Sequence, residues 1–297
     1  MHESHAANVE LGRHLNNVPN ELLSEILGHL VRHRDEPVEV VSARHPMPTI
    51  AHSIDKTDIS AASLVSLRWR ALAVPHLFYD VVFRHRSAKT RPNHDLQSFE
   101  SFLDKHPHFY HVIFNLSLVD QEYLDSVDNA SAMTNSVGVE FLSRFDNLRS
   151  LVLVSFAPTP IPKGVTIKVR SLSVVEYIGP CQLWRTLSCF SAVKRLLIHY
   201  PQSRYLKDAG WEPGILDRLQ VSELVLLNSL ACCPVLHGLL HDQAKVPLRA
   251  LTLDINPEWL QINRTNHSIP SALEQLSKCL VDFCFTVSGS EFHHGMS

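Results

Sequence analysis

The chain has 297 residues, of which 45% are hydrophobic, so it can fill the core of one large domain or two ordinary ones. Its 27 Lys and Arg residues stand against 30 Asp and Glu residues, and the net charge is −3. A chain with this balance has no overall basic field that would attract nucleic acid or acidic lipid. We therefore expect a folded protein whose partners are neither nucleic acid nor a membrane.

The N-terminal stretch MHESHAANVELGRHLNN has no apolar run of signal-peptide length, and we expect residues 1–14 to be disordered. The most apolar window, residues 224–240, is interrupted by polar residues and a proline, so no membrane span is predicted. The six cysteines all fall in the second half without the paired spacing of a zinc site, which is typical of reduced thiols. We expect a cytoplasmic and/or nuclear protein.

The first predicted element is an amphipathic helix in NVPNELLSEILGHLV, with Pro19 and Glu21 in its first turn. Its apolar side chains fall within one arc at the helical period of 3.6: Leu22, Leu23, Ile26, Leu27 and Leu30. The following residues, about 34–55, contain three prolines, many charges and no sustained period. They are predicted to form a long, flexible inserted loop.

A second helix is predicted to begin near Ser60 and to stop at Pro75. One side of it is apolar, with Ala61, Leu64, Val65, Trp69 and Leu72. Arg68 and Arg70 lie mostly off that side, so they are expected at the wet edge of a packing helix, either solvated or with their stems laid over apolar surface.

These two helices resemble the F-box. Its usual pattern runs Leu-Pro, x, Glu-Leu-Leu, two residues and Ile-Leu, and later Leu-Val-Cys-Arg-x-Trp-Arg with a downstream Leu-Phe. The chain has VPNELLSEIL and then ASLVSLRWRALAVPHLF, in the form found in many fungal proteins. The resemblance covers about residues 15–88 and implies a three-helix domain that docks on the Skp-type adaptor of a cullin ubiquitin ligase.

Carried over residue by residue, the resemblance implies an adaptor-binding surface of Val18, Pro19, Leu22, Leu23, Ile26, Leu27, Leu30, Leu64, Val65 and Trp69. Some of these side chains must instead form the core of the domain, and the pattern does not divide them. Leu67 stands where the family often has a basic residue, so it either extends the docking surface or packs on the following domain.

The rest of the chain repeats the phrase apolar-x-x-Leu-x-apolar, which predicts seven strands. The phrases are IFNLSL, LRSLVL, VRSLSV, VKRLLI, VSELVL, LRALTL and LVDFCF, with central residues at Leu116, Leu151, Leu172, Leu196, Leu224, Leu251 and Phe283. Predicted helices alternate with them: DLQSFESFLDKH, VEFLSRF, CQLWRTLSCF, GILDRLQ, PVLHGLLHD and SALEQLSKCL. FAPTPIPKG, with three prolines, is predicted to be a plain loop.

Strands that alternate with helices imply parallel pairing, either in an ordinary α/β sheet or in a stack of leucine-rich-repeat-like units. The second region resembles the degenerate leucine-rich repeats of many F-box proteins, where this region selects the substrate. The expected fold class is α+β overall. Residues 89–288 form an irregular α/β leucine-rich-repeat-like solenoid with parallel strands, and residues 289–297 form a disordered tail.

If the central leucines point into the core, the alternate residues face the open side of the sheet. Four charged or titratable residues fall there and are the candidate substrate-binding residues: Arg195, His199, Glu223 and Asp254. Arg195 and Glu223 occupy equivalent positions on consecutive strands, so they are also suited to pair with each other at the surface. The same face could be covered by the chain's own tail.

Enzyme signatures are weak. There is no Gly-x-Ser-x-Gly motif and no phosphate-binding glycine loop. His237 and His241 in CCPVLHGLLHD share a helix face, but Gly238 stands where a His-Glu-x-x-His zinc site needs glutamate. We expect no catalytic residue, metal or cofactor, and a substrate receptor that acts by proximity. The alternative is a metal-dependent or cysteine-using enzyme on a leucine-rich-repeat-like scaffold.

Overall fold

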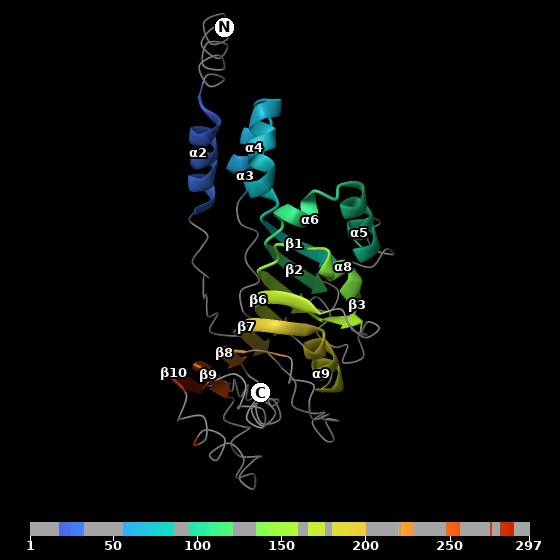
Figure 1. Cartoon of the computed structure of the whole chain (residues 1–297), viewed down its shortest axis with the longest axis vertical. Coiled ribbons are helices and arrows are strands. Elements are labelled where there is room, and N and C mark those ends of the chain that lie inside the picture. Colours follow the sequence, from blue (N-terminus) through green and yellow to red (C-terminus); the bar gives the residue numbers. More distant parts are fainter. Residues whose placement is uncertain are drawn as a thin grey trace, which may run out of the picture. The chain divides into compact units, whose positions relative to one another are not determined.

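The structure is a computed structural model of the chain (Figure 1). It describes residues 18–32, 56–85, 95–120, 135–159, 166–175, 180–199, 219, 221–227, 248–255, 274 and 280–287. The chain divides into two compact units. We call them the helical unit (Met1–Val40 and Ala51–Asp80) and the sheet unit (Val41–Ile50 and Val81–Ser297). Three predicted segments lie outside the described residues: residues 1–14, the loop at about 34–55 and the tail from residue 289.

The helical unit is built from α2 (Asn20–Arg32), α3 (Thr57–Ser63) and α4 (Leu67–Leu77), which lie side by side (Figure 1). Their facing sides form one apolar core of Leu23, Leu27, Ile59, Trp69 and Ala73. Val18, Ala62, Leu72 and Leu77 pack around it and are partly buried. Residues from both ends of the unit's sequence therefore meet in one core, as the two apolar helical patterns require.

The second predicted helix is wrong in its limits, because the structure divides it into α3 and α4. The backbone N–H groups of Leu64 and Val65 bond carbonyls three residues earlier, which closes α3 with a tight turn. Ser66 then starts α4, and its hydroxyl accepts a 3.2 Å hydrogen bond from the Trp69 backbone N–H. Pro75 lies inside α4, which continues to Leu77 rather than stopping at the proline.

Polar side chains hold the three helices at their ends. The Arg68 guanidinium donates to the Asn20 side chain at 2.6 Å and to the Val18 carbonyl, so it joins the start of α4 to the start of α2. The Arg70 Nε atom donates to the Ser63 carbonyl at 3.3 Å. The two arginines beside Trp69 therefore bond backbone and side-chain groups of the unit itself rather than standing only in solvent.

The sheet unit contains an eight-stranded sheet in the order β1-β2-β4-β6-β7-β8-β9-β10. Its strands are β1 (Asp80–His85), β2 (Asn115–Asp120), β4 (Ser150–Val154), β6 (Ile167–Val175), β7 (Phe190–His199), β8 (Glu223–Leu227), β9 (Ala250–Ile255) and β10 (Asp282–Val287). The pairings from β2 to β10 are all parallel. Mixed helices and strands with parallel pairing confirm the coarse fold class expected from the sequence.

All seven strands expected from the repeated phrase are present, and the phrases align in register. The central residues pair across neighbouring strands in one row: Leu116, Leu151, Leu172, Leu196, Leu224, Leu251 and Phe283. The six leucines are almost fully buried. Phe283 keeps its place in this row but is 51% exposed, so the expectation that it is buried in the core is wrong at β10, the last strand of the sheet order.

Helices α5 (Leu96–Lys105), α8 (Val139–Ser143) and α9 (Pro180–Ser188) lie along one side of the sheet (Figure 1). A short helix, α6 (Phe109–Val112), precedes β2. The Asp95 side chain caps α5 by accepting from the Ser98 backbone N–H at 2.6 Å. The helices predicted in GILDRLQ, PVLHGLLHD and SALEQLSKCL lie outside the described residues, apart from Leu219, Glu274 and Leu280. Of these three residues only Glu274 is helical.

A second, two-stranded sheet was not anticipated. It pairs β3 (Asn135–Gly138) in parallel with β5 (Phe156–Thr159), so the prediction of a plain loop in FAPTPIPKG is wrong for its first four residues. Pro158 is tolerated because both strands of a two-stranded sheet are edge strands, where a missing N–H group costs little.

Ser155 directs the chain from β4 into β5. Its φ of 54° lies in the left-handed region, and the residue is 1% exposed. The Ser155 N–H donates to the Val175 carbonyl at 3.1 Å, and its carbonyl accepts from the Asn135 N–H at 3.2 Å. The Asn135 amide in turn donates to the Asp120 carboxylate at 2.6 Å. The carboxyl ends of β2, β4 and β6 are thereby tied to the start of β3.

Two further expectations concern the boundary between the units and membrane-spanning helices. The boundary between the units lies at Asp80, earlier than the expected residue 88, because β1 belongs to the eight-stranded sheet. Among the helices that the structure describes, none is long and apolar enough to span a bilayer.

Candidate docking surface

The structure divides the ten predicted adaptor-binding residues between the core and the surface of the helical unit. Leu23, Leu27 and Trp69 belong to the core, and Val18 packs partly buried against it. Pro19 is exposed, and the side chain of Leu30 lies outside the described residues. The other four large apolar residues are exposed by 51%, 48%, 74% and 54%, and they are Leu22, Ile26, Leu64 and Val65.

Leu67, the departure from the family pattern, is 81% exposed at the start of α4. It therefore extends the exposed apolar surface and does not pack in the core of the helical unit. We call Leu22, Ile26, Leu64, Val65 and Leu67 together the leucine patch. The sequence contained a signal for this residue, since an apolar side chain at a position off the main apolar arc has no packing role in the helix itself.

The bonds of Arg68 place two members of the leucine patch, Leu22 and Leu67, at the same end of the helical unit. Because Arg68 bonds Asn20 and the Val18 carbonyl, the turn between α3 and α4 lies at the same end of the unit as the first turn of α2. Leu67 precedes Arg68 directly, and Leu22 lies in the first turn of α2. Five exposed large apolar side chains on so small a unit, with Leu22 and Leu67 at one end of it, are more than the scattered exposure that is normal on a monomer surface.

Few charged groups accompany the leucine patch. Glu21 and Glu25 lie on the exposed part of α2, and the Glu25 carboxylate is 4.0 Å from the His29 imidazole. In α4, burial lowers the pKa of His76 below its ordinary value of 6.5. The patch can thus exclude water and bind an apolar partner, but it offers no arrangement for acid or base chemistry.

Of the four predicted substrate-binding residues, Arg195 and Glu223 lie opposite each other in the register of β7 and β8, as expected. Both are partly buried. The Glu223 carboxylate lies 3.2 Å from the ammonium group of Lys194, the residue that precedes Arg195. This pair is exposed on both sides and contributes little to stability.

The expectation that His199 and Asp254 are exposed is wrong, because they are only 4% and 6% exposed. They lie at the carboxyl ends of β7 and β9, in the same register row as Val175. In that row Val119, Val154 and Val175 form a buried apolar cluster, against which Val82, Val152 and Leu197 pack. His199 and Asp254 lie on the side of the sheet opposite the central leucines, as the strand period predicts. That side is nevertheless buried at the carboxyl ends of β7 and β9.

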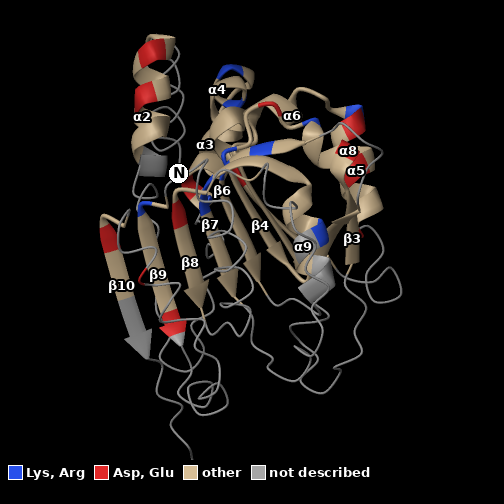
Figure 2. Cartoon of the chain, turned by 60° about the horizontal axis from the view of Figure 1, so that its bottom comes forward, with Lys and Arg blue, Asp and Glu red and all other residues tan. Residues whose placement is uncertain are grey.

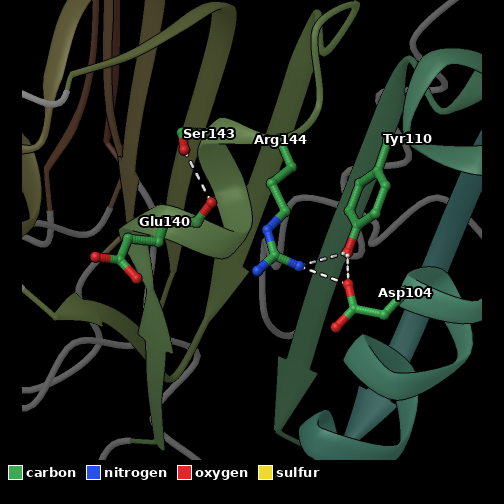
Figure 3. A network of polar contacts seen from close by, with 5 residues as sticks. All are labelled: Asp104, Tyr110, Glu140, Ser143 and Arg144. Atoms are coloured by element: carbon green, nitrogen blue, oxygen red, sulfur yellow. Dashed lines mark hydrogen bonds and ion pairs between the residues drawn. The ribbon is translucent and has the colours of Figure 1, made fainter. Parts of the chain in front are cut away.

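A polar network joins α5, α6 and the end of α8 (Figure 3). The Arg144 guanidinium donates to the Asp104 carboxylate at 2.5 Å and to the Tyr110 hydroxyl at 3.2 Å, and Tyr110 donates to Asp104 at 3.0 Å. Burial is the largest cause that raises the pKa of Tyr110 above its ordinary value. A neutral tyrosine between a carboxylate and a guanidinium links three helices, and it is not activated as a base or nucleophile.

Aromatic packing supports the structural role of this network. The Tyr110 ring lies 5.0 Å from Phe145 and 6.3 Å from Phe141, both in edge-to-face geometry. Among the described residues, no three His, Cys, Asp or Glu side chains are grouped so that they could hold a metal ion. His237 and His241, on which the enzyme alternative depends, lie outside the described residues.

A scan against protein-family models, a search of curated proteins and a search of solved structures each found no match for this chain. Its function is therefore inferred from its own residues and their arrangement.

Proposed function

We propose that the chain is the substrate-recognition subunit of a Skp/cullin/F-box ubiquitin ligase. The helical unit docks on the Skp-type adaptor, and the sheet unit holds the target protein, so that ubiquitin transfer is accelerated by proximity. No residue of the chain is assigned a catalytic role, and no cofactor is required. The proposed location is the cytoplasm and/or the nucleus, where such ligases act.

The observation that carries the proposal is the leucine patch. Leu23, Leu27 and Trp69 are buried in the core of the helical unit, while the residues of the leucine patch remain exposed. Burying these exposed side chains against a partner is favourable by about 25 cal/mol per Å² of apolar surface. The sequence motif suggests the partner, and the exposed apolar side chains, which belong to that motif or adjoin it, form a surface suited to such a partner.

The buried and exposed sets also change which residues an experiment should target. Leu27 is fully buried, so a charged residue there unfolds the unit and tests nothing about docking. Ile26 and Leu22 are about half exposed and lie four residues apart on α2, which makes them suitable targets.

We expect Leu22→Asp with Ile26→Asp to weaken binding to a purified fungal Skp-type adaptor by about 100-fold or more, since a carboxylate buried against apolar surface costs several kcal/mol. Binding is measured by isothermal titration calorimetry with the full chain. Circular dichroism checks that the variant retains the helical content and melting temperature of the parent.

The control for each single variant, Leu22→Asp or Ile26→Asp, is Ser24→Asp, which likewise introduces one carboxylate at an exposed position of the same helix, away from the leucine patch. It should bind the adaptor within about twofold of the parent. If the parent chain does not bind the adaptor at all, or if the double variant binds as tightly as the control, the proposal is wrong. Stoichiometric metal in the purified chain without adaptor binding would favour the enzyme alternative.

A further inference from the structure

The repeated phrase of the sheet unit carries a second regularity that the proposed function does not use. Its second position is basic in four of the seven phrases: LRSLVL, VRSLSV, VKRLLI and LRALTL. The corresponding residues are Arg149, Arg170, Lys194 and Arg249, and all four are exposed. A charge at the same position of several repeats becomes a row when the repeats stack in register.

The register places these four residues in one row across the sheet, two residues before the central leucines. Arg149 and Arg249 directly precede β4 and β9, while Arg170 and Lys194 lie inside β6 and β7. Ser150 pairs with Ser171, so Arg149 and Arg170 are neighbours, and Val169 and Ser171 pair with Val193 and Arg195, so Arg170 neighbours Lys194. Backbone bonds extend the row, because the Ser222 N–H donates to the Lys194 carbonyl and the Arg249 N–H donates to the Ser222 carbonyl. We call Arg149, Arg170, Lys194 and Arg249 the basic row.

The geometry gives the basic row a length and a spacing. Neighbouring strands lie about 4.8 Å apart, so the four strand steps from β4 to β9 make a row about 19 Å long. Figure 2 shows a blue segment where β9 begins and a red segment where β8 begins. That acidic position is Glu223, whose carboxylate is already paired with Lys194 at 3.2 Å.

Within the described part of the chain, no carboxylate forms an ion pair with Arg149, Arg170 or Arg249. Arg149 instead lies over the Phe114 ring at 4.7 Å. Like charges on neighbouring strands repel each other, so the row reduces the stability of the free sheet. This arrangement stands out in a chain that has more acidic than basic residues.

We propose that the basic row is a binding surface for an extended protein segment rich in Asp and Glu. An extended chain rises about 3.3 Å per residue, so about six residues cover the row from Arg149 to Arg249. Arginine binds carboxylates through two parallel hydrogen bonds, which fixes the direction of such a segment. The surface lies on the N-terminal side of the central leucines, away from the buried His199 and Asp254 at the carboxyl ends.

Single-stranded nucleic acid is the less suitable occupant. Its binding surfaces combine cations with aromatic rings on which successive bases stack. The ring at this row, Phe114, is half-buried and already covered by Arg149. If the chain is a substrate receptor, the acidic segment belongs to the substrate, and only this assignment depends on the proposed function. The surface itself is tested without the adaptor, so the two proposals fail separately.

The test uses the full chain and a fluorescein-labelled peptide of ten residues, with glutamate at every second position and threonine between. Fluorescence anisotropy should give a Kd of about 100 µM or below at 50 mM NaCl, weakened about fivefold or more at 300 mM because of screening. The same peptide with glutamine in place of glutamate should not bind. Arg170→Glu with Arg249→Glu should weaken binding about tenfold or more.

Two controls separate a specific surface from a general effect of charge. Lys105→Glu with Arg185→Glu makes the same change in net charge at exposed positions of α5 and α9, and binding should stay within about twofold. Arg170→Glu alone places a carboxylate between Arg149 and Lys194, so it should raise the melting temperature while it lowers peptide binding. A purely structural role for Arg170 predicts the opposite change in stability.

Three results would overturn the proposal. The first is no peptide binding at 50 mM NaCl. The second is an equal loss of binding in the Lys105→Glu, Arg185→Glu control. The third is tighter binding of a labelled ten-nucleotide oligo-dT that Arg170→Glu with Arg249→Glu abolishes, which would make the row a nucleic-acid surface.

Discussion

The two units of the chain expose opposite kinds of surface. The helical unit buries a small core and leaves Leu22, Ile26 and three further large apolar side chains exposed, whereas the sheet unit buries its repeated leucines and exposes cations at the same position of several repeats. An apolar surface gives affinity through water exclusion, and a charged row gives direction and a dependence on salt. The comparison teaches that the two proposed interactions depend on different physical forces, so salt and mutation can separate them.

The largest loss of stability is expected from truncating a core residue in the middle of the sheet. Leu196 is fully buried in β7 and pairs with Leu172 and Leu224, so Leu196→Ala should cost about 2–5 kcal/mol. Leu197, the next residue, is half-buried on the other side, and Leu197→Ala should cost less than half as much. Hydrogen exchange of peptides from β6, β7 and β8 measures both losses. Equal losses would mean that the phase of the repeated phrase is wrong.

The helical unit gives the same contrast at a smaller scale. Leu27→Ala should cost about 2–4 kcal/mol because its side chain is fully buried, while Ile26→Ala should cost about 1 kcal/mol or less. Hydrogen exchange across α2 and α4 reports the change. A larger loss for Ile26→Ala would place Ile26 in the core and remove it from the leucine patch.

Removal of the helix cap at Ser66 should reduce stability by less than truncation of either core leucine. Ser66→Ala removes the hydroxyl that accepts from the Trp69 N–H, and we expect a loss of about 1 kcal/mol in the stability of α4. Ser66→Asp restores an acceptor and serves as the matched variant. If Ser66→Ala and Ser66→Asp were equally unstable, the break between α3 and α4 would not depend on this cap.

The smallest expected change in stability is the pH dependence that His76 gives to α4. Burial lowers the pKa of His76 in the folded unit, so the unfolded chain takes up a proton first as the pH falls below 6.5. The stability of α4 should therefore be constant above that pH and should decline as the pH falls through it. His76→Gln should reduce this decline, as measured by hydrogen exchange at pH 7.5 and 5.5 with correction for intrinsic rates. A steeper decline in His76→Gln would contradict the assignment.

The features that depend on local periodicity were predicted well. The apolar phrase placed seven strands and their common register, because each repeat carries its own core residues and pairs with its neighbours. Within the docking surface, the sequence could not separate Ile26 from Leu27. Both lie on one apolar arc, and the direction from which α4 approaches decides which of them is buried.

The failures have a different origin. The pair β3 and β5 is short, contains Pro158 and gains its pairing from strands distant in sequence, so no local pattern indicates it. The burial of His199 and Asp254 likewise depends on what covers the carboxyl ends of the strands, which the alternation of a single strand does not contain.

Ser155 limits how a chain of this kind can change its number of repeats. A strand-and-helix unit that bonds only to its neighbours can be duplicated or deleted with one new junction. The stretch from β2 to β5 is different, since bonds link Asp120, Asn135 and Ser155 within it, and the left-handed backbone of Ser155 sets the direction in which the chain leaves the main sheet. We therefore expect the removal of one strand-and-helix unit to disrupt fewer side-chain and turn bonds on the β6–β10 side of the sheet than between Asn115 and Thr159.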